Sequence, residues 1–393
     1  MTLADRSEFV IRQVAEHPLL LDELLDSRIF DNPPSRAELE KVLQDTLERQ
    51  AGGDAEGRLE AIRLFQRAAL FRIAVADRLG HLPLMKVSDR LTDTAELILQ
   101  LALDTAWSEL IERFGEPMCG EDSAARGVGF AIIGYGKLGG LELGYGSDLD
   151  LVFLHDSSGS HQETAGPSKV DNGRFFARLV QRLIHFLSIQ TGSGRLYEVD
   201  TRLRPSGRSG LPVPSLDSFL PYQRDRAWVW EHQALLRSRA VAGSERVGGA
   251  FEEIRREVLI HHVDRDNLKR EIIAMRQRMR HELSLSKAEE FDLKQDPGGL
   301  SDIEFLVDYW VLAHAHEFPD LVKFPDKVRQ LEELERTGLV TPEHCTRIKN
   351  IYIALRESAH ELALNEGGRI VRGDSFAEER GWIGSVWAEV LGA

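Results

Sequence analysis

Apolar residues recur at helical spacing through most of this chain, and one central stretch departs from that pattern. Over Glu56–Leu79 and Leu91–Phe114 the apolar positions repeat every three or four residues, which predicts two amphipathic helices. The same period predicts a helix over Arg174–Gln190 and returns from Asp217 to the end of the chain. Ser35 precedes a helical segment, and we expect its hydroxyl to cap that helix.

The central stretch combines short apolar runs with glycine-rich loops. Gly129–Ile133 and Leu149–His155 are predicted as strands, and Leu196–Val199 as a third, short one that ends at Asp200. Residues 157–173 are polar and lack an apolar period, so we expect a loop long enough to be a mobile element that faces the substrate.

This order of elements predicts an α+β fold that is predominantly helical, with a small sheet flanked by helical regions. We expect three parts: an N-terminal helical region (1–118), a central α+β domain (119–245) and a C-terminal helical bundle (246–393). Ser301, which follows an Asp-Pro-Gly-Gly turn, is expected to cap a helix of the bundle.

Composition narrows the function classes. The apolar runs are too short and too charged to span a bilayer, and no basic-plus-apolar leader is expected because Asp5 and Glu8 come early. The two cysteines, Cys119 and Cys345, are too few for a cysteine-based zinc cluster and fit the reducing cytoplasm. A net charge of −15 argues against nonspecific nucleic-acid binding.

The charge is unevenly distributed. Residues 195–240 contain eight arginines, no lysine and five acidic residues, so this segment is basic within an acidic chain. We expect contacts to a triphosphate there. The alternative is a set of solvated helix faces with salt bridges, and we expect this for the arginines from Arg224 onward.

The motif with the clearest chemistry is FAIIGYGKLGGLELGYGSDLDLVFLHD, residues 130–156. In an extended segment, Asp148 and Asp150 point to one face and Leu149 points into the core. Two carboxylates at one edge repel each other unless a cation lies between them, and Mg²⁺ prefers such oxygen ligands. Gly134 and Gly136 upstream would let backbone N–H groups approach a phosphate. This combination favours phosphoryl or nucleotidyl transfer from a nucleoside triphosphate.

Two other phosphate-binding motifs are rejected. Gly134–Gly139 matches the G-x-G-x-x-G pattern of dinucleotide-binding folds, but only residues 140–147 separate it from the next strand. A parallel crossover needs about a dozen residues or more, so we predict a short helical turn and an antiparallel strand. A Walker-type loop is excluded because Lys137 is not followed by Ser or Thr.

A third carboxylate and several arginines follow the acid pair. Asp200 ends a short predicted strand, and in an extended chain Arg202 and Arg204 would share its face. Their guanidinium groups suit paired contacts to phosphate oxygens. The alternative is a purely structural network of aspartate and arginine.

These residues together resemble a known family. GYGKLGGLELGYGSDLDLVFLHD closely resembles the active-site signature of glutamine synthetase adenylyltransferase, a member of the DNA polymerase β-like nucleotidyltransferase superfamily. Further segments resemble the same family, in the same order: HPLLLDELLD, FRIAVADRLG with LPLMKVSDRLT, YEVDTRLRPSGRSG, WEHQALLRSRAVAG and DPGGLSDIEFLV. The resemblance implies that residues 119–245 are a nucleotidyltransferase catalytic domain with a polymerase β-like sheet.

The resemblance also implies a reaction and partners. One half of the family enzyme attaches AMP from ATP to a tyrosine of glutamine synthetase, and the other half removes it. This chain has one acid-pair signature, and it resembles the adenylylating half. We therefore expect a fragment of a two-half enzyme or an unusually short protein, without deadenylylation and with lost or altered control by glutamine and the PII signal protein.

The expected roles follow residue by residue. Asp148 and Asp150 would hold two Mg²⁺ ions, and Asp200 would complete one site and accept the tyrosine proton. Backbone or hydroxyl donors would face the phosphates, and cationic groups would balance the developing charge; these are Gly134, Gly136, Ser147, Lys137, Arg202 and Arg204. Two alternatives stay open: a nucleotidyltransferase with another acceptor, and a non-catalytic module that senses ATP or PII.

Overall fold

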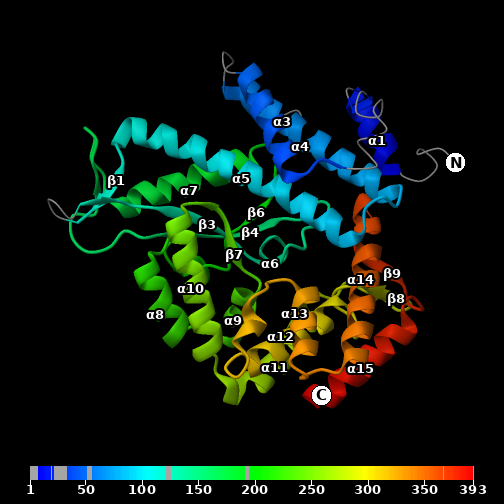
Figure 1. Cartoon of the computed structure of the whole chain (residues 1–393). Coiled ribbons are helices and arrows are strands. Elements are labelled where there is room, and N and C mark those ends of the chain that lie inside the picture. Colours follow the sequence, from blue (N-terminus) through cyan, green and yellow to red (C-terminus); the bar gives the residue numbers. More distant parts are fainter. Residues whose placement is uncertain are drawn as a thin grey trace. The chain divides into compact units, whose positions relative to one another are not determined.

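The computed structural model describes residues 8–18, 20–21, 33–50, 55–120, 125–190, 194–365 and 367–392. The chain forms two compact units, and each is built from two segments. Unit 1 comprises residues 1–219 and 239–252, and unit 2 comprises residues 220–238 and 253–393. Helices dominate both units and the sheets are small, so the predicted α+β, predominantly helical fold is confirmed (Figure 1).

In the described part of the chain, these helices precede the first strand: α1 (Glu8–Glu16), α3 (Arg36–Arg49), α4 (Ala55–Arg78) and α5 (Leu84–Phe114). The expected cap at Ser35 is confirmed, since its hydroxyl accepts from the Glu38 N–H and the Glu38 carboxylate accepts from the Ser35 N–H. Helix α5 begins seven residues before its predicted start. The helical pattern of residues 17–26 falls mostly outside the described part of the chain.

A four-stranded mixed sheet carries the central motif. Its strand order is β6 (Val199–Asp200), β4 (Leu149–His155), β3 (Phe130–Gly134) and β7 (Arg239–Gly243). Strands β3 and β4 are antiparallel, and the single helical turn α6 (Gly136–Gly139) lies between them in the sequence, as predicted. Strand β7 was not predicted: the helical period does not persist from Asp217, because residues 239–243 pair antiparallel with β3.

Helices α5 and α7 (Asn172–Ser188) pack together (Figure 1). Their aromatic side chains extend the core of the sheet. Trp107 of α5 contacts the rings of Phe175 and Phe176 at centroid distances of 5.5 and 6.2 Å. Phe176 in turn stacks on Phe130 of β3 at 5.6 Å. All five residues of β3 are buried, so the sheet that bears the motif has an apolar, closely packed support.

The segment 157–173 contains more structure than predicted. Its strand β5 (Glu163–Thr164) pairs with β1 (Pro117–Cys119), which also pairs with β2 (Arg126–Gly127). Its two ends are tied together because the buried Asn172 amide donates to the Ser157 hydroxyl and to the Met118 carbonyl, each at 2.8 Å. Most of the segment is loop, as predicted, with one short strand, and its mobility stays a prediction.

Unit 2 is helical apart from one two-stranded sheet. Strands β8 (Glu290–Asp292) and β9 (Ile370–Arg372) pair antiparallel. The helices that lie wholly in this unit are α9 (Val229–Leu236), α11 (Arg265–Leu283), α12 (Leu300–His314), α13 (Lys327–Arg336), α14 (Pro342–Leu364) and α15 (Ala377–Leu391), with a 3₁₀ turn at Pro319–Val322. Helices α8 (Leu216–Asp225) and α10 (Glu245–His261) each run from unit 1 into unit 2.

A buried ion pair fixes the start of α12. The Arg276 guanidinium donates to the Asp302 carboxylate at 2.6 Å, and both side chains are at most 3 % exposed. Asp302 also accepts from the Gly298 N–H at 2.7 Å. The predicted cap at Ser301 is wrong: the helix is capped at Gly299, and Ser301 lies buried inside it.

Among the described helices, none combines the length and the apolar character needed to cross a lipid bilayer.

Candidate active site

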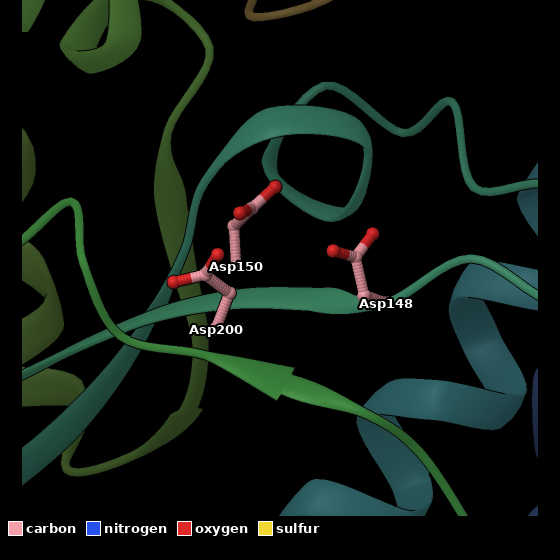
Figure 2. Close-up of side chains that lie close together, drawn as sticks. All are labelled: Asp148, Asp150 and Asp200. Atoms are coloured by element: carbon pink, nitrogen blue, oxygen red, sulfur yellow. The ribbon is translucent and has the colours of Figure 1, made fainter.

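Three carboxylates meet at one edge of the four-stranded sheet. Asp148 directly precedes β4, Asp150 is its second residue, and Leu149 between them is fully buried, as the alternation predicts. Strand β6 runs parallel to β4 and places Asp200 beside Asp150 in register. Figure 2 shows the three side chains gathered together, and they offer one oxygen each within 4.8 Å of one another.

The chemistry of this donor set suits a hard divalent cation. Three carboxylates at this spacing repel one another, and a cation between them removes that repulsion. Oxygen donors at short mutual distances are the ligands that Mg²⁺ and similar ions prefer. An open cavity of about 490 Å³ adjoins the cluster and is lined by Asp148, Glu198, Val199, Asp200, Thr201, Arg202 and Arg204. The residues present therefore fit a metal ion with a phosphate-bearing ligand beside it.

The two glycines of the first loop have steric reasons to be glycine. Gly136 has a φ of +55°, and a Cβ there would collide with the Asp150 carboxylate. A Cβ on Gly134 would lie 2.8 Å from Val241 and 3.0 Å from Leu138. The loop therefore passes close to the acid pair, and its backbone approach to a phosphate stays a prediction.

Ser147 is held by the loop that leads into β4. Its hydroxyl accepts from the Gly144 N–H at 3.2 Å and from the Lys137 ammonium at 3.3 Å. Lys137 lies on α6, so this contact joins the glycine loop to the residue before Asp148. Lys137 is exposed and Ser147 is half-buried, which leaves both side chains accessible to a ligand.

The backbone at Arg202 and Arg204 is not extended as predicted, because residues 202–203 form a turn. The turn brings Arg202 back onto Asp200, and its Nε donates to the two carboxylate oxygens at 2.7 and 3.0 Å. The pKa of Arg202 is raised, first by the hydrogen bond and charge of Asp200 and then by Asp150 and Asp148. Arg204 instead donates to the Thr201 carbonyl at 2.7 Å. Arg202 thus faces all three acids, whereas Arg204 braces the turn.

A buried tyrosine anchors the second glycine loop, and sequence reasoning missed it. The Tyr145 hydroxyl donates to the Asp77 carboxylate of α4 at 3.0 Å. Burial, together with the Asp77 charge, raises the pKa of Tyr145 well above its usual value. The only signal in the sequence was a Tyr between two glycines, and a partner 68 residues away gives no local pattern.

Clusters of carboxylates on neighbouring strands that can hold divalent ions are typical of enzymes that act on phosphate esters, and the three acids at β4 and β6 form a cluster of this kind. A family model described as glutamate-ammonia ligase adenylyltransferase matches residues 1–254, and a second, described as GlnD PII-uridylyltransferase, matches residues 266–369. The chain belongs to the glutamate-ammonia ligase adenylyltransferase family.

Curated relatives agree over the whole chain. Three are named bifunctional glutamine synthetase adenylyltransferase/adenylyl-removing enzyme. The protein of Thioalkalivibrio sulfidiphilus is 48 % identical and aligns with 99 % of this chain. Those of Pseudomonas aeruginosa and Hahella chejuensis are 47 % and 45 % identical over 99 % and 98 % of it. This chain spans only about two fifths of each relative's length, since the covered shares are 40 %, 41 % and 40 %.

Proposed function

We propose that this chain transfers AMP from ATP to a tyrosine hydroxyl of glutamine synthetase and releases pyrophosphate, and so takes part in regulating nitrogen assimilation. Family membership supports the reaction class and the relatives' names support the acceptor. The observation that carries the proposal is the pairing of Asp150 with Asp200, which with Asp148 forms a carboxylate cluster beside an open cavity.

We assign Asp148, Asp150 and Asp200 to the binding of Mg²⁺, which would lower the pKa of the acceptor hydroxyl and neutralise phosphate charge. The tyrosine oxygen forms a bond to the α-phosphorus, the bond from that phosphorus to the β-bridging oxygen breaks, and pyrophosphate leaves. Asp200 accepts the phenolic proton. Its neighbour Arg202 already lies on the carboxylate, so it is placed to exchange that contact for a phosphate oxygen.

The remaining site residues are assigned to the nucleotide. Gly134 and Gly136 present backbone donors, and the hydroxyl of Ser147 adds a further one. Lys137 and Arg202 balance the charge that develops on the phosphates. Arg204 lines the same cavity and is assigned to the nucleotide through its remaining guanidinium hydrogens, since one nitrogen is committed to Thr201.

The test is to incubate the chain with ATP, MgCl₂ and purified glutamine synthetase and to follow the intact mass of the synthetase subunit. We expect one added AMP per subunit. Asp150→Asn should slow the reaction by at least about a thousandfold, which corresponds to ~4 kcal/mol at ~1.4 kcal/mol per tenfold.

Glu163→Gln is the matched control, because it also neutralises one carboxylate of unit 1 but lies in an exposed ion pair with Lys169. It should retain the parental rate. Near-parental AMP transfer by Asp150→Asn would refute the assignment. Transfer of AMP to a small hydroxyl compound or an RNA end, with none to the synthetase, would favour a different nucleotidyltransferase. Mg²⁺-independent ATP binding without transfer would favour a sensing module.

Regulation and location form a further part of the proposal. The match of residues 266–369 to a PII-uridylyltransferase model supports a C-terminal region that responds to the PII signal protein, and we include glutamine as a second effector. We place the reaction in the cytoplasm, where ATP is abundant and where the two buried free thiols, Cys119 and Cys345, stay reduced. No nucleic acid or membrane has a part in it.

A further inference from the structure

Helix α7 has an unusual charge pattern for this chain. It contains three arginines and no acidic residue, although the whole chain carries a net charge of −15. Arg174, Arg178, Arg182 and His185 follow one another at spacings of four, four and three residues, which places them on one side of the helix. We call these four residues the α7 basic strip. It extends for about 16 Å at 1.5 Å per residue.

Most of this charge is not neutralised by the protein. Arg182 pairs with Glu109 of α5, and both side chains are strongly exposed, at 41 % and 56 %. Across the described residues, Arg174 and Arg178 have no carboxylate partner, and neither does Arg113 of α5. The guanidiniums of Arg113 and Arg178 lie over the Phe114 ring, at 5.0 and 4.9 Å from its centroid. Stacking on the ring orients these cations while leaving their N–H donors available.

The strip borders a groove of about 400 Å³ between α5 and α7. Leu110 and Phe114 form its apolar part, and Gln181, with arginines from both helices, forms its polar rim. The contacts of the half-buried Trp107 with the buried Phe175 and Phe176 fix the two helices against each other. The groove is therefore a preformed surface that combines a short apolar floor with a line of cationic side chains, of which Arg113 and Arg178 have no carboxylate partner among the described residues.

We propose that the α7 basic strip and this groove form a docking site for an acidic segment of a protein partner. Carboxylates one helical turn apart would match the spacing of the arginines, and each could accept two hydrogen bonds from a guanidinium. A line of separated cations suits several carboxylates better than a single phosphate, which needs donors that converge on one point. This surface contains none of the carboxylate-site residues, so the inference does not depend on the proposed reaction.

Charge complementarity favours a protein segment over a nucleic acid. The strip is short and the molecule is strongly acidic, so a long polyanion would be repelled beyond the immediate contact. A short acidic segment with an apolar residue for the groove avoids this penalty, because it extends no further than the strip. Since the arginines are exposed, binding should be weak and salt-sensitive.

The probe is a fluorescein-labelled peptide of about 16 residues, built from Ala and one Leu with Glu at every fourth position. Its anisotropy is followed on titration with the full chain at low and high NaCl, and a Gln-for-Glu peptide controls for charge. We expect binding of the Glu peptide at low salt, no binding of the Gln peptide, and at least tenfold weaker binding at high salt.

Arg174→Gln combined with Arg178→Gln should weaken peptide binding at least tenfold. The matched control is Arg270→Gln with Arg278→Gln, which removes the same charge from exposed positions on α11 and should change binding less than twofold. Circular dichroism and melting verify the fold of each variant.

Three outcomes would overturn the proposal: no Glu-peptide binding at low salt, equal losses in both double variants, or tighter strip-dependent binding of a single-stranded DNA of similar charge. In the last case the strip would be a nucleic-acid contact instead.

Discussion

At the scale of single residues, Gly136 shows how closely the glycine loop approaches the acids. Its positive φ and the adjacent Asp150 carboxylate both oppose any side chain at this position. Gly136→Ala should therefore add about 1–3 kcal/mol of backbone strain and displace Asp150. We expect AMP transfer to fall by at least tenfold, measured as kcat/KM for ATP, while the protein remains folded.

Gly159→Ala separates strain from collision. Gly159 has a similar φ of +72°, but a Cβ there would meet nothing within 4 Å. The Gly159→Ala variant should lose about 1 kcal/mol of stability and keep its activity. Equal effects of the two substitutions on activity would contradict a contact of Gly136 with the acid pair.

His155 predicts a pH dependence of stability. The ring is buried and stacks on Phe176 at 4.6 Å, and its Nδ1 accepts from the Ser157 N–H. Burial lowers the pKa of His155 to about 4 in the folded state, against 6.5 for a solvent-exposed histidine. The unfolded chain therefore binds a proton first as pH falls, and stability is lost between about pH 6.5 and pH 4.

The expected loss from this residue is about 3 kcal/mol at pH 4. His155→Gln keeps a hydrogen-bond acceptor and does not titrate, so its free energy of unfolding should fall less steeply over that range. Chemical denaturation at several pH values measures the difference. Parallel pH profiles for the two proteins would show that His155 is not the cause.

At the scale of elements, α4 holds the second glycine loop through one hydrogen bond. Tyr145→Phe removes the hydroxyl that donates a hydrogen bond to Asp77 and leaves this part-buried carboxylate with one partner fewer. The free energy of unfolding should fall by about 1–3 kcal/mol. We expect the loop that carries Ser147 to loosen, so that the KM for ATP rises more than kcat falls.

Asp77→Asn keeps an acceptor oxygen and should lose less than Tyr145→Phe. In the double variant the two effects should not add, because they remove one interaction. Additive losses would mean that the two residues act separately, and unchanged ATP kinetics in Tyr145→Phe would show that the anchor does not position the loop.

The elements that the sequence predicts well are those with a local cause. The apolar run of Leu149–His155 and the short loop after β3 determine an antiparallel pair, and the Ser35 cap depends on a residue three positions away. Strand β7 escaped prediction because Arg239–Gly243 is a short run of Arg, Ala, Val and Gly whose strand character comes from pairing with β3. The turn at Arg202 likewise depends on its contact with Asp200.

At the scale of the whole molecule, the carboxylate cluster couples metal binding to stability. Any ion that binds the folded state alone adds RT ln(1 + [L]/Kd), which is about 2.7 kcal/mol at a hundredfold excess over Kd. We expect MgCl₂ to raise the free energy of unfolding of the parental chain and to have little effect on Asp148→Asn.

In EDTA, Asp148→Asn should have a higher free energy of unfolding than the parental chain, because the substitution relieves repulsion among the three acids. Thermal melting with MgCl₂ and with EDTA tests both statements. A parental chain that melts at the same temperature in both conditions would argue against a metal site.

The division of the chain into regions 1–118, 119–245 and 246–393 stays a prediction. The structure itself divides the chain into two compact units.

The position of β7 has a consequence for how the protein is made. Strand β3 ends at Gly134 and its neighbour β7 begins at Arg239, so 104 residues must be synthesised between them. At ~5–20 residues per second, a ribosome needs roughly 5–20 s for this interval. During that time the apolar β3 strand has one edge open to other nascent chains. Chaperone demand should therefore peak before residue 239 emerges and decline once β7 has closed the edge.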